Sequence, residues 1–152
     1  MKKILFVCTG NICRSPSADG ILKQLAANRG MSGDVHVDSC GLQSMHAGES
    51  ADSRSAKAAL KRGYDLSDQV SRQVRVSDFT EFDWVLALDR SHERALTEMA
   101  PPEFKDKVKL MLPFSGITHT DEVPDPYYGG AEGFEHVLDL LEASCENLLK
   151  MV

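Results

Sequence analysis

Residues 3–16 read Lys-Ile-Leu-Phe-Val-Cys-Thr-Gly-Asn-Ile-Cys-Arg-Ser-Pro, and this stretch decides how the chain folds. The apolar run Ile4–Val7 predicts a buried strand that ends at Cys8. Ser15 and Pro16 are typical of a helix start, with Ser15 as the N-cap and Pro16 at the first helical position. The loop between the strand and the helix turns its backbone N–H groups toward one point beside the Cys8 thiol. Such a loop is suited to bind an oxyanion next to a nucleophile.

The rest of the chain alternates apolar strands with amphipathic helices. The sequence predicts strands over 3–8, 35–40, 82–88 and 108–112, and helices over 15–29, from Asp52 to Gly63, from Ser91 to before Pro101, and over 131–150. Residues 113–130 are rich in proline and glycine and are expected to hold no clear regular structure. We therefore expect one domain over residues 1–152, with a three-layer α/β/α architecture. Its central four-stranded parallel sheet is expected to have the flavodoxin-like order 2-1-3-4.

Composition limits the classes of function that the chain can have. Its 152 residues, 42% of them hydrophobic, suit a single core. A net charge of −6 leaves no large basic surface, so we expect no nucleic-acid partner and no membrane partner. The cysteines are too sparse for a disulfide-stapled secreted domain and are not spaced for a zinc site; they are Cys8, Cys13, Cys40 and Cys145. We expect no metal, no signal peptide and a reducing cytoplasmic setting.

The loop of residues 9–15 has the chemistry of a phosphate cradle. A phosphate monoester dianion repels an approaching thiolate, so attack requires that this repulsion be cancelled. Loop amides, the N-terminus of the following helix and the guanidinium fork of Arg14 supply a positive environment, which also favours the thiolate form of Cys8. Gly10 permits the close approach of a ligand. Asn11 tolerates a left-handed conformation and is expected to lock the loop with its amide.

This loop, Cys8–Pro16, resembles the active-site loop of the low-molecular-weight protein tyrosine phosphatases. A second match is Asp125-Pro126-Tyr127-Tyr128-Gly129-Gly130, where the family carries its general acid in an Asp-Pro motif followed by pocket aromatics. Shorter matches lie at residues 46–49 with 51–52, and at 86–91. The likeness covers essentially the whole chain, and the two main motifs are specific in combination.

The resemblance implies a two-step hydrolysis of phosphotyrosine and aryl phosphate monoesters that needs no metal or cofactor. Cys8 attacks phosphorus to form a phosphocysteine, and Asp125 protonates the leaving phenolate and then activates water. Arg14 and the loop amides hold the equatorial oxygens, Ser15 stabilises the sulfur, and Asn11 holds the loop. The phosphate-binding loop so defined comprises Thr9, Gly10, Asn11, Ile12, Cys13, Arg14 and Ser15.

The resemblance also assigns a substrate pocket and supporting residues. The pocket comprises Ile12, Met45, Tyr127 and Tyr128, and its rings are expected to receive an aryl group. The supporting residues are Asn11, Ser15, Gln69 and Asp89. Cys13 is either an inert packing residue or the redox partner of Cys8, since a disulfide between them would protect the nucleophile from irreversible oxidation.

Three positions depart from the family's pattern. Gln69 stands where many relatives have a histidine, and we expect its amide to support Asn11 without carrying a charge. Met45 replaces an aromatic wall and predicts a wider pocket that is less selective for flat rings. Thr9 replaces a leucine found in many eukaryotic relatives and makes the rim more polar.

Three other functions compete with this interpretation. Arsenate reduction on the same fold uses further cysteines on a mobile segment, and residues 63–91 contain none. Relatives that act on phosphoarginine carry threonine after the loop asparagine, whereas Ile12 favours an aryl ring. An inactive phosphotyrosine-binding module would have lost Cys8, Arg14 or Asp125, and all three are present.

The expected partner is a phosphotyrosine-containing protein substrate. Bacterial members of the family often act on tyrosine kinases that control polysaccharide export, so a bacterial tyrosine kinase is the example that analogy suggests. For the oligomeric state we expect a monomer or a weak dimer.

Overall fold

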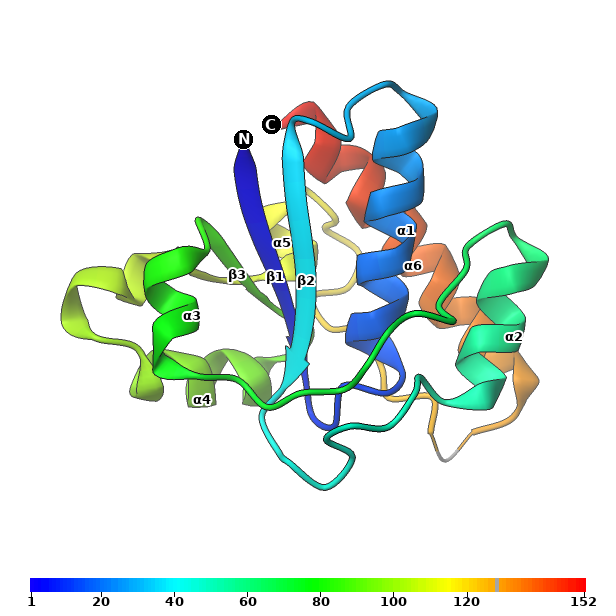
Figure 1. The fold of residues 1–152 in the computed structure, drawn as a ribbon, viewed down its shortest axis with the longest axis horizontal. Coiled ribbons are helices and arrows are strands. Elements are labelled where there is room, and N and C mark those ends of the chain that lie inside the picture. The colour runs from blue at the N-terminus through cyan, green and yellow to red at the C-terminus, as the bar shows by residue number, and fades with distance from the viewer. Residues whose placement is uncertain (128) are drawn as a thin grey trace.

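The computed structural model describes residues 1–127 and 129–152 and contains a sheet of four parallel strands. Strand β1 (Lys2–Cys8) pairs with β2 (Val35–Gly41) and with β3 (Trp84–Ala87), and β3 pairs with β4 (Val108–Leu110). The strand order is β2-β1-β3-β4. The predicted fold class, a three-layer α/β/α architecture with sheet order 2-1-3-4, is confirmed (Figure 1).

Helices cover both faces of the sheet because every second side chain of β1 points to the same face. Ile4 and Phe6 pack with α1 (Arg14–Asn28), α2 (Ser53–Lys61) and α6 (Ala131–Lys150) in one core. Leu5 and Val7 pack in a second core with α3 (Val76–Glu81) and α4 (Arg90–Met99). The remaining short elements are a 3₁₀ helix, η1 (Pro102–Lys107), and α5 (Met111–Phe114). Strand β1 is thus buried on both faces, which fixes the position of the loop that follows it.

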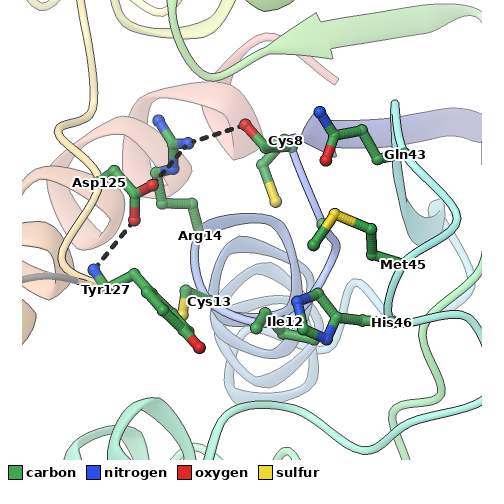
Figure 2. Close-up of a pocket in the computed structure, with 11 residues that line it drawn as sticks. Cys8, Ile12, Cys13, Arg14, Gln43, Met45, His46, Asp125 and Tyr127 are labelled. Atoms are coloured by element: carbon green, nitrogen blue, oxygen red, sulfur yellow. Dashed lines mark hydrogen bonds and ion pairs between the residues drawn. The ribbon is translucent and has the colours of Figure 1, made fainter.

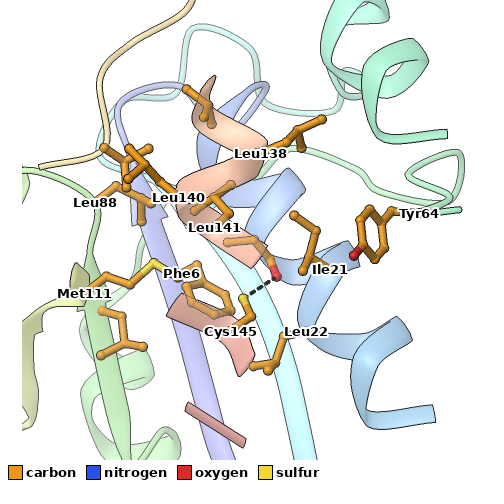
Figure 3. Close-up of a cluster of buried hydrophobic side chains, with 14 of the residues drawn as sticks. Phe6, Ile21, Leu22, Tyr64, Leu88, Met111, Leu138, Leu140, Leu141 and Cys145 are labelled. Atoms are coloured by element: carbon orange, nitrogen blue, oxygen red, sulfur yellow. Dashed lines mark hydrogen bonds between the residues drawn. The ribbon is translucent and has the colours of Figure 1, made fainter. Parts of the chain in front are cut away.

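All four cysteines belong to these cores. Cys40 and Cys145 are fully buried, and burial raises the pKa of both thiols. The Cys145 sulfur lies 3.8 Å from the carbonyl oxygen of Ala18, which joins α6 to α1 (Figure 3). These two thiols therefore have packing roles, as the apolar sequence around them suggests.

The N-cap of α1 lies two residues earlier than predicted, and the difference matters. The helix begins at Arg14 with Cys13 at the N-cap position, so the predicted N-cap role of Ser15 is wrong. Ser15 is instead the second helical residue and Pro16 the third, and the Ser15 side chain is buried inside the loop. The loop needs that hydroxyl for its own hydrogen bonds, so it is not available to cap the helix.

Two short helices were not predicted. Helix α3 has 6 residues and α5 has 4, which is too short for a helical hydrophobic period to show. Helix α3 starts where the Asp78 carboxylate accepts a hydrogen bond from the Arg75 amide at 2.8 Å. Helix α5 contains Pro113, which we expected to open an irregular segment. Both helices depend on their tertiary surroundings.

The end of β2 presses against the loop that follows β1, and glycine is required there. Gly41 pairs with Cys8 in the parallel register. A Cβ atom on Gly41 would lie 2.8 Å from the Thr9 carbonyl oxygen and 2.9 Å from the Gly10 carbonyl carbon. Both contacts are backbone atoms, so no side chain can rotate away to relieve them.

We predict that Gly41→Ala lowers the free energy of unfolding by about 1–3 kcal/mol, because the added methyl overpacks backbone on backbone. Urea denaturation followed by circular dichroism measures this change. Gly33→Ala is the matched control, since no atom lies within 4 Å of a Cβ at that position. Equal unfolding midpoints for the two variants would contradict the predicted close approach.

Candidate functional site

The loop between β1 and α1 is held in a left-handed turn by the side chain of Asn11. Asn11 has a φ of 59°, the one positive φ outside glycine in the described part of the chain. Its side-chain nitrogen donates to the hydroxyls of Ser15 at 2.8 Å and Ser39 at 2.9 Å. Its side-chain oxygen accepts from the Arg72 amide at 3.1 Å. These bonds satisfy a buried amide and fix the path of the loop.

Residues far along the chain from Asn11 supply part of this hydrogen-bond network. Ser39 and Arg72 lie 28 and 61 residues from Asn11, and the Ser71 hydroxyl donates to the Asn11 carbonyl oxygen. Sequence reasoning missed all three. Ser71 and Arg72 follow closely after Gln69 in the sequence, but nothing in their residue types distinguishes them from surface residues. Ser39 gave no signal beyond its place at the end of a strand.

The structure corrects the role of Gln69. We predicted that its amide supports Asn11, but the Asn11 side chain bonds to Ser15, Ser39 and the Arg72 amide, and Gln69 lies near the Asp19 carboxyl on α1. Asp19 is buried, and this burial raises its pKa to about 6 although Lys23 lies 2.9 Å away. The prediction failed because Ser71 and the Arg72 amide already occupy the positions facing Asn11.

Cys8 lies at the floor of the loop with its sulfur 2.9 Å from the Ser15 hydroxyl oxygen. That hydroxyl also accepts from Asn11 and lies 3.2 Å from the Cys40 carbonyl oxygen. An ionised sulfur is only an acceptor, so Ser15 donates to it in that state. The Ser15 hydroxyl thus connects the Cys8 sulfur to the hydrogen-bond network of Asn11.

The Arg14 guanidinium is buried and held from several sides. It donates through Nη1 to Asp89 at 2.9 Å and to the Val123 carbonyl at 3.1 Å. Its Nη2 is 3.4 Å from the Thr9 hydroxyl oxygen and 3.7 Å from the Asp125 carboxylate. Although burial opposes it, hydrogen bonds including those from Ser91 and Arg14 keep the pKa of Asp89 below its usual range. Asp89 is therefore an anion that orients the arginine.

A buried histidine extends this network. His92 Nε2 is 2.9 Å from the Thr9 hydroxyl, and Nδ1 is 3.3 Å from Asp89. Burial, together with the nearby Arg14 charge, lowers the His92 pKa to about 4, so the ring is neutral at pH 7. The Asp89 carboxylate can only accept, so it favours the tautomer with the ring proton on Nδ1, in which the Thr9 hydroxyl donates to Nε2. Sequence reasoning missed His92, which lies just past the matching segment 86–91.

These groups surround a cavity of about 210 Å³. Figure 2 shows Asp125 and Tyr127 on one wall and Gln43, Met45 and His46 on the opposite wall. The cavity lining also includes Cys8, Thr9, Gly10, Ile12, Cys13 and Arg14. Of the residues predicted from sequence, the structure thus brings Cys8, Arg14, Asp125, Ile12, Met45 and Tyr127 to one place. Gln43 and His46 were not among the predicted pocket residues.

Cys13, Asp125 and Met45 line this cavity but differ in how far they are buried. Burial raises the pKa of Cys13 to about 12, so it is a neutral thiol at pH 7. Asp125 is half-exposed, and its carboxylate accepts from the Tyr127 amide at 2.9 Å, which fixes it in a turn. Met45 is 74% exposed and forms only the outer rim. Tyr128, predicted to line the pocket, lies outside the described residues.

The part of the chain that the structure describes contains no metal site. No group of three or more histidine, cysteine, aspartate or glutamate side chains among residues 1–127 and 129–152 is arranged to hold a metal ion. None of the described helices is long and apolar enough to cross a membrane.

Comparisons with known proteins agree along nearly the whole chain. The family model described as low molecular weight phosphotyrosine protein phosphatase matches residues 3–152. A low molecular weight protein-tyrosine-phosphatase of Streptomyces coelicolor is 42% identical, over 99% of this chain and 93% of that protein. A protein tyrosine phosphatase from Entamoeba histolytica, solved with Hepes in its active site, superposes with a TM-score of 0.94 at 44% identity, over 99% and 96% of the two chains. A Drosophila arginine phosphatase superposes with a TM-score of 0.91 at 34% identity, over 99% and 97%.

The buried histidine predicts a pH dependence of stability. The ordinary pKa of histidine is 6.5, and that of folded His92 is about 4. The unfolded chain therefore binds a proton between these values that the folded chain does not. Stability from this group is complete above pH 6.5 and is lost as pH falls, by ~3 kcal/mol in total.

We predict that His92→Gln reduces the loss of unfolding free energy between pH 7 and pH 4.5 by about 2–3 kcal/mol. Urea denaturation at a series of pH values measures it. His119→Gln, at an exposed position, is the control and should keep the wild-type pH dependence. An identical pH dependence in the His92 variant and wild type would contradict the prediction.

Proposed function

The chain belongs to the low molecular weight phosphotyrosine protein phosphatase family, and we propose that it hydrolyses phosphotyrosine through a phosphocysteine formed on Cys8. As a member of this family the protein is a protein-tyrosine-phosphatase, a phosphoric monoester hydrolase. Residues 1–152 act as one phosphatase domain. The observation that carries the proposal is that Cys8, Arg14 and Asp125 line one cavity at the end of β1.

In the first step the Cys8 sulfur attacks phosphorus on the side opposite the tyrosine oxygen. The S–P bond forms as the P–O bond to the ring breaks, and Asp125 gives its proton to the departing phenolate oxygen. Arg14 and the loop amides hold the three other oxygens while charge redistributes among them. Support for this role of Arg14 comes from its bonds to Asp89 and Val123, which hold it without using all of its donors.

In the second step water attacks the phosphocysteine. Asp125, now a carboxylate, takes a proton from that water, and the S–P bond breaks to release inorganic phosphate and the Cys8 thiolate. The Ser15 hydroxyl, 2.9 Å from the sulfur, stabilises the thiolate as it leaves. Cys13 lines the same cavity and is the proposed disulfide partner of an oxidised Cys8.

An aryl phosphate is the substrate that the cavity walls favour. Ile12 and the Tyr127 ring offer apolar contact to a flat ring, whereas a guanidinium group would need polar partners. The exposed Met45 leaves the rim open. The similarity to a Drosophila arginine phosphatase makes phosphoarginine the second candidate substrate, on the same Cys8 and Arg14 chemistry.

The substrates are phosphoproteins, and a bacterial tyrosine kinase is the proposed example, by analogy with the family. We also propose a cytoplasmic location, since all four cysteines are free thiols and a reducing compartment preserves Cys8. A monomer or weak dimer is the proposed oligomeric state.

We predict that Cys8→Ser abolishes phosphate release and that Asp125→Asn lowers kcat/KM for a phosphotyrosine peptide about 100-fold or more. The Asp125 loss should be much smaller with p-nitrophenyl phosphate, because nitrophenolate leaves without a proton. Steady-state phosphate release measures both substrates, with phosphoarginine assayed alongside.

The matched control is Asp121→Asn, which removes an exposed carboxylate that pairs with Arg90 near the same segment. It should keep kcat/KM within about twofold, as surface ion pairs contribute little. Full activity of Cys8→Ser, or an equal loss of Asp125→Asn activity on both aryl substrates, would contradict the assigned roles.

A further inference from the structure

A second cavity, of about 300 Å³, opens between α2 and the start of α6. Three cationic side chains of α2 line it, Arg54, Lys57 and Lys61, and Phe134 and Glu135 of α6 form its other side. The two helices lie side by side in Figure 1. The cations follow the spacing i, i+3 and i+7, so they share one face of α2. We call this cavity the α2–α6 groove.

The α2–α6 groove adjoins the catalytic pocket through one side chain. The Arg54 guanidinium lies 5.1 Å from the centre of the Tyr127 ring and 5.0 Å from the centre of the Phe134 ring. Tyr127 is a wall of the catalytic pocket, and Phe134 is a wall of the groove. A peptide whose phosphotyrosine fills the pocket therefore passes directly over Arg54 to reach the groove.

Some charged side chains of the groove form ion pairs, and others do not. Arg54 pairs with Asp52 at 3.2 Å, and Glu135 pairs with Arg62 at 2.8 Å. Among the residues that the structure describes, neither Lys57 nor Lys61 forms an ion pair with an acidic side chain. The groove thus presents two unneutralised positive charges on a chain whose net charge is −6. Local positive potential beside an anion site attracts acidic groups.

We propose that the α2–α6 groove binds acidic residues that flank the phosphotyrosine of the protein substrate, with Lys57 and Lys61 as the charges that select them. This inference rests on the proposed phosphatase function and adds a sequence preference to it. An extended peptide advances about 3.3 Å per residue, so residues within a few positions of the phosphotyrosine reach the lysines.

The test compares acidic and neutral phosphotyrosine peptides. One acidic peptide carries three glutamates before the phosphotyrosine and another carries them after it, and in each neutral peptide glutamine replaces glutamate. We expect the acidic-to-neutral ratio of kcat/KM to be about five- to tenfold for at least one pair in the wild type. The ratio should fall to one or below in Lys57→Glu/Lys61→Glu, and it should shrink with added salt.

Lys150→Glu is the matched control, because it reverses an exposed charge at the other end of α6, roughly 30 Å away along the helix. Its ratio should equal that of the wild type. A wild-type ratio near one for both pairs, or a ratio unchanged in the double variant, would overturn the groove's role while leaving the phosphatase function intact. No turnover of any phosphotyrosine peptide by the wild type would instead contradict the proposed function, and the groove's role with it.

Discussion

The left-handed turn at Asn11 is the constraint on which the rest of the site depends. A non-glycine residue with a φ of 59° is held there by hydrogen bonds that its side chain donates to Ser15 and Ser39 and accepts from the Arg72 amide. The turn brings the end of β1, the start of α1 and the end of β2 together. Without it the Ser15 hydroxyl would not meet the Cys8 sulfur.

The site holds a single buried cation, Arg14. Arg14 is the one cation that the resemblance placed in the loop, and the structure surrounds it with Asp89, Asp125 and the Thr9 hydroxyl. His92 stays neutral there because its burial and the arginine charge both oppose protonation. The network therefore orients the guanidinium without adding a second cation that would compete with Arg14 for the Asp89 carboxylate.

Much of the fold follows from the sequence because long elements carry their own pattern. The last helix was predicted with its observed bounds, Ala131–Lys150, and strand–helix alternation predicted the parallel sheet. Helices α3 and α5 are too short to show a hydrophobic period. Ser15 was wrongly predicted as the N-cap of α1, because its hydroxyl bonds to groups of the loop instead. Gln69 was misassigned because two residues nearby in sequence, Ser71 and Arg72, reach Asn11 first. Tertiary geometry decides which of several neighbouring polar side chains forms a given hydrogen bond, and the local sequence pattern does not encode that geometry.

The central claim is that the loop presents the Cys8 sulfur, and no other group, to phosphorus. Rapid quenching of the wild type during turnover of p-nitrophenyl phosphate, followed by proteolysis and mass spectrometry, tests it most directly. We expect one phosphoryl group, on Cys8 and not on Cys13, that appears before steady state and decays when substrate is exhausted. A phosphoryl group on another residue, or burst-free turnover with no phosphoenzyme at any quench time, would contradict it.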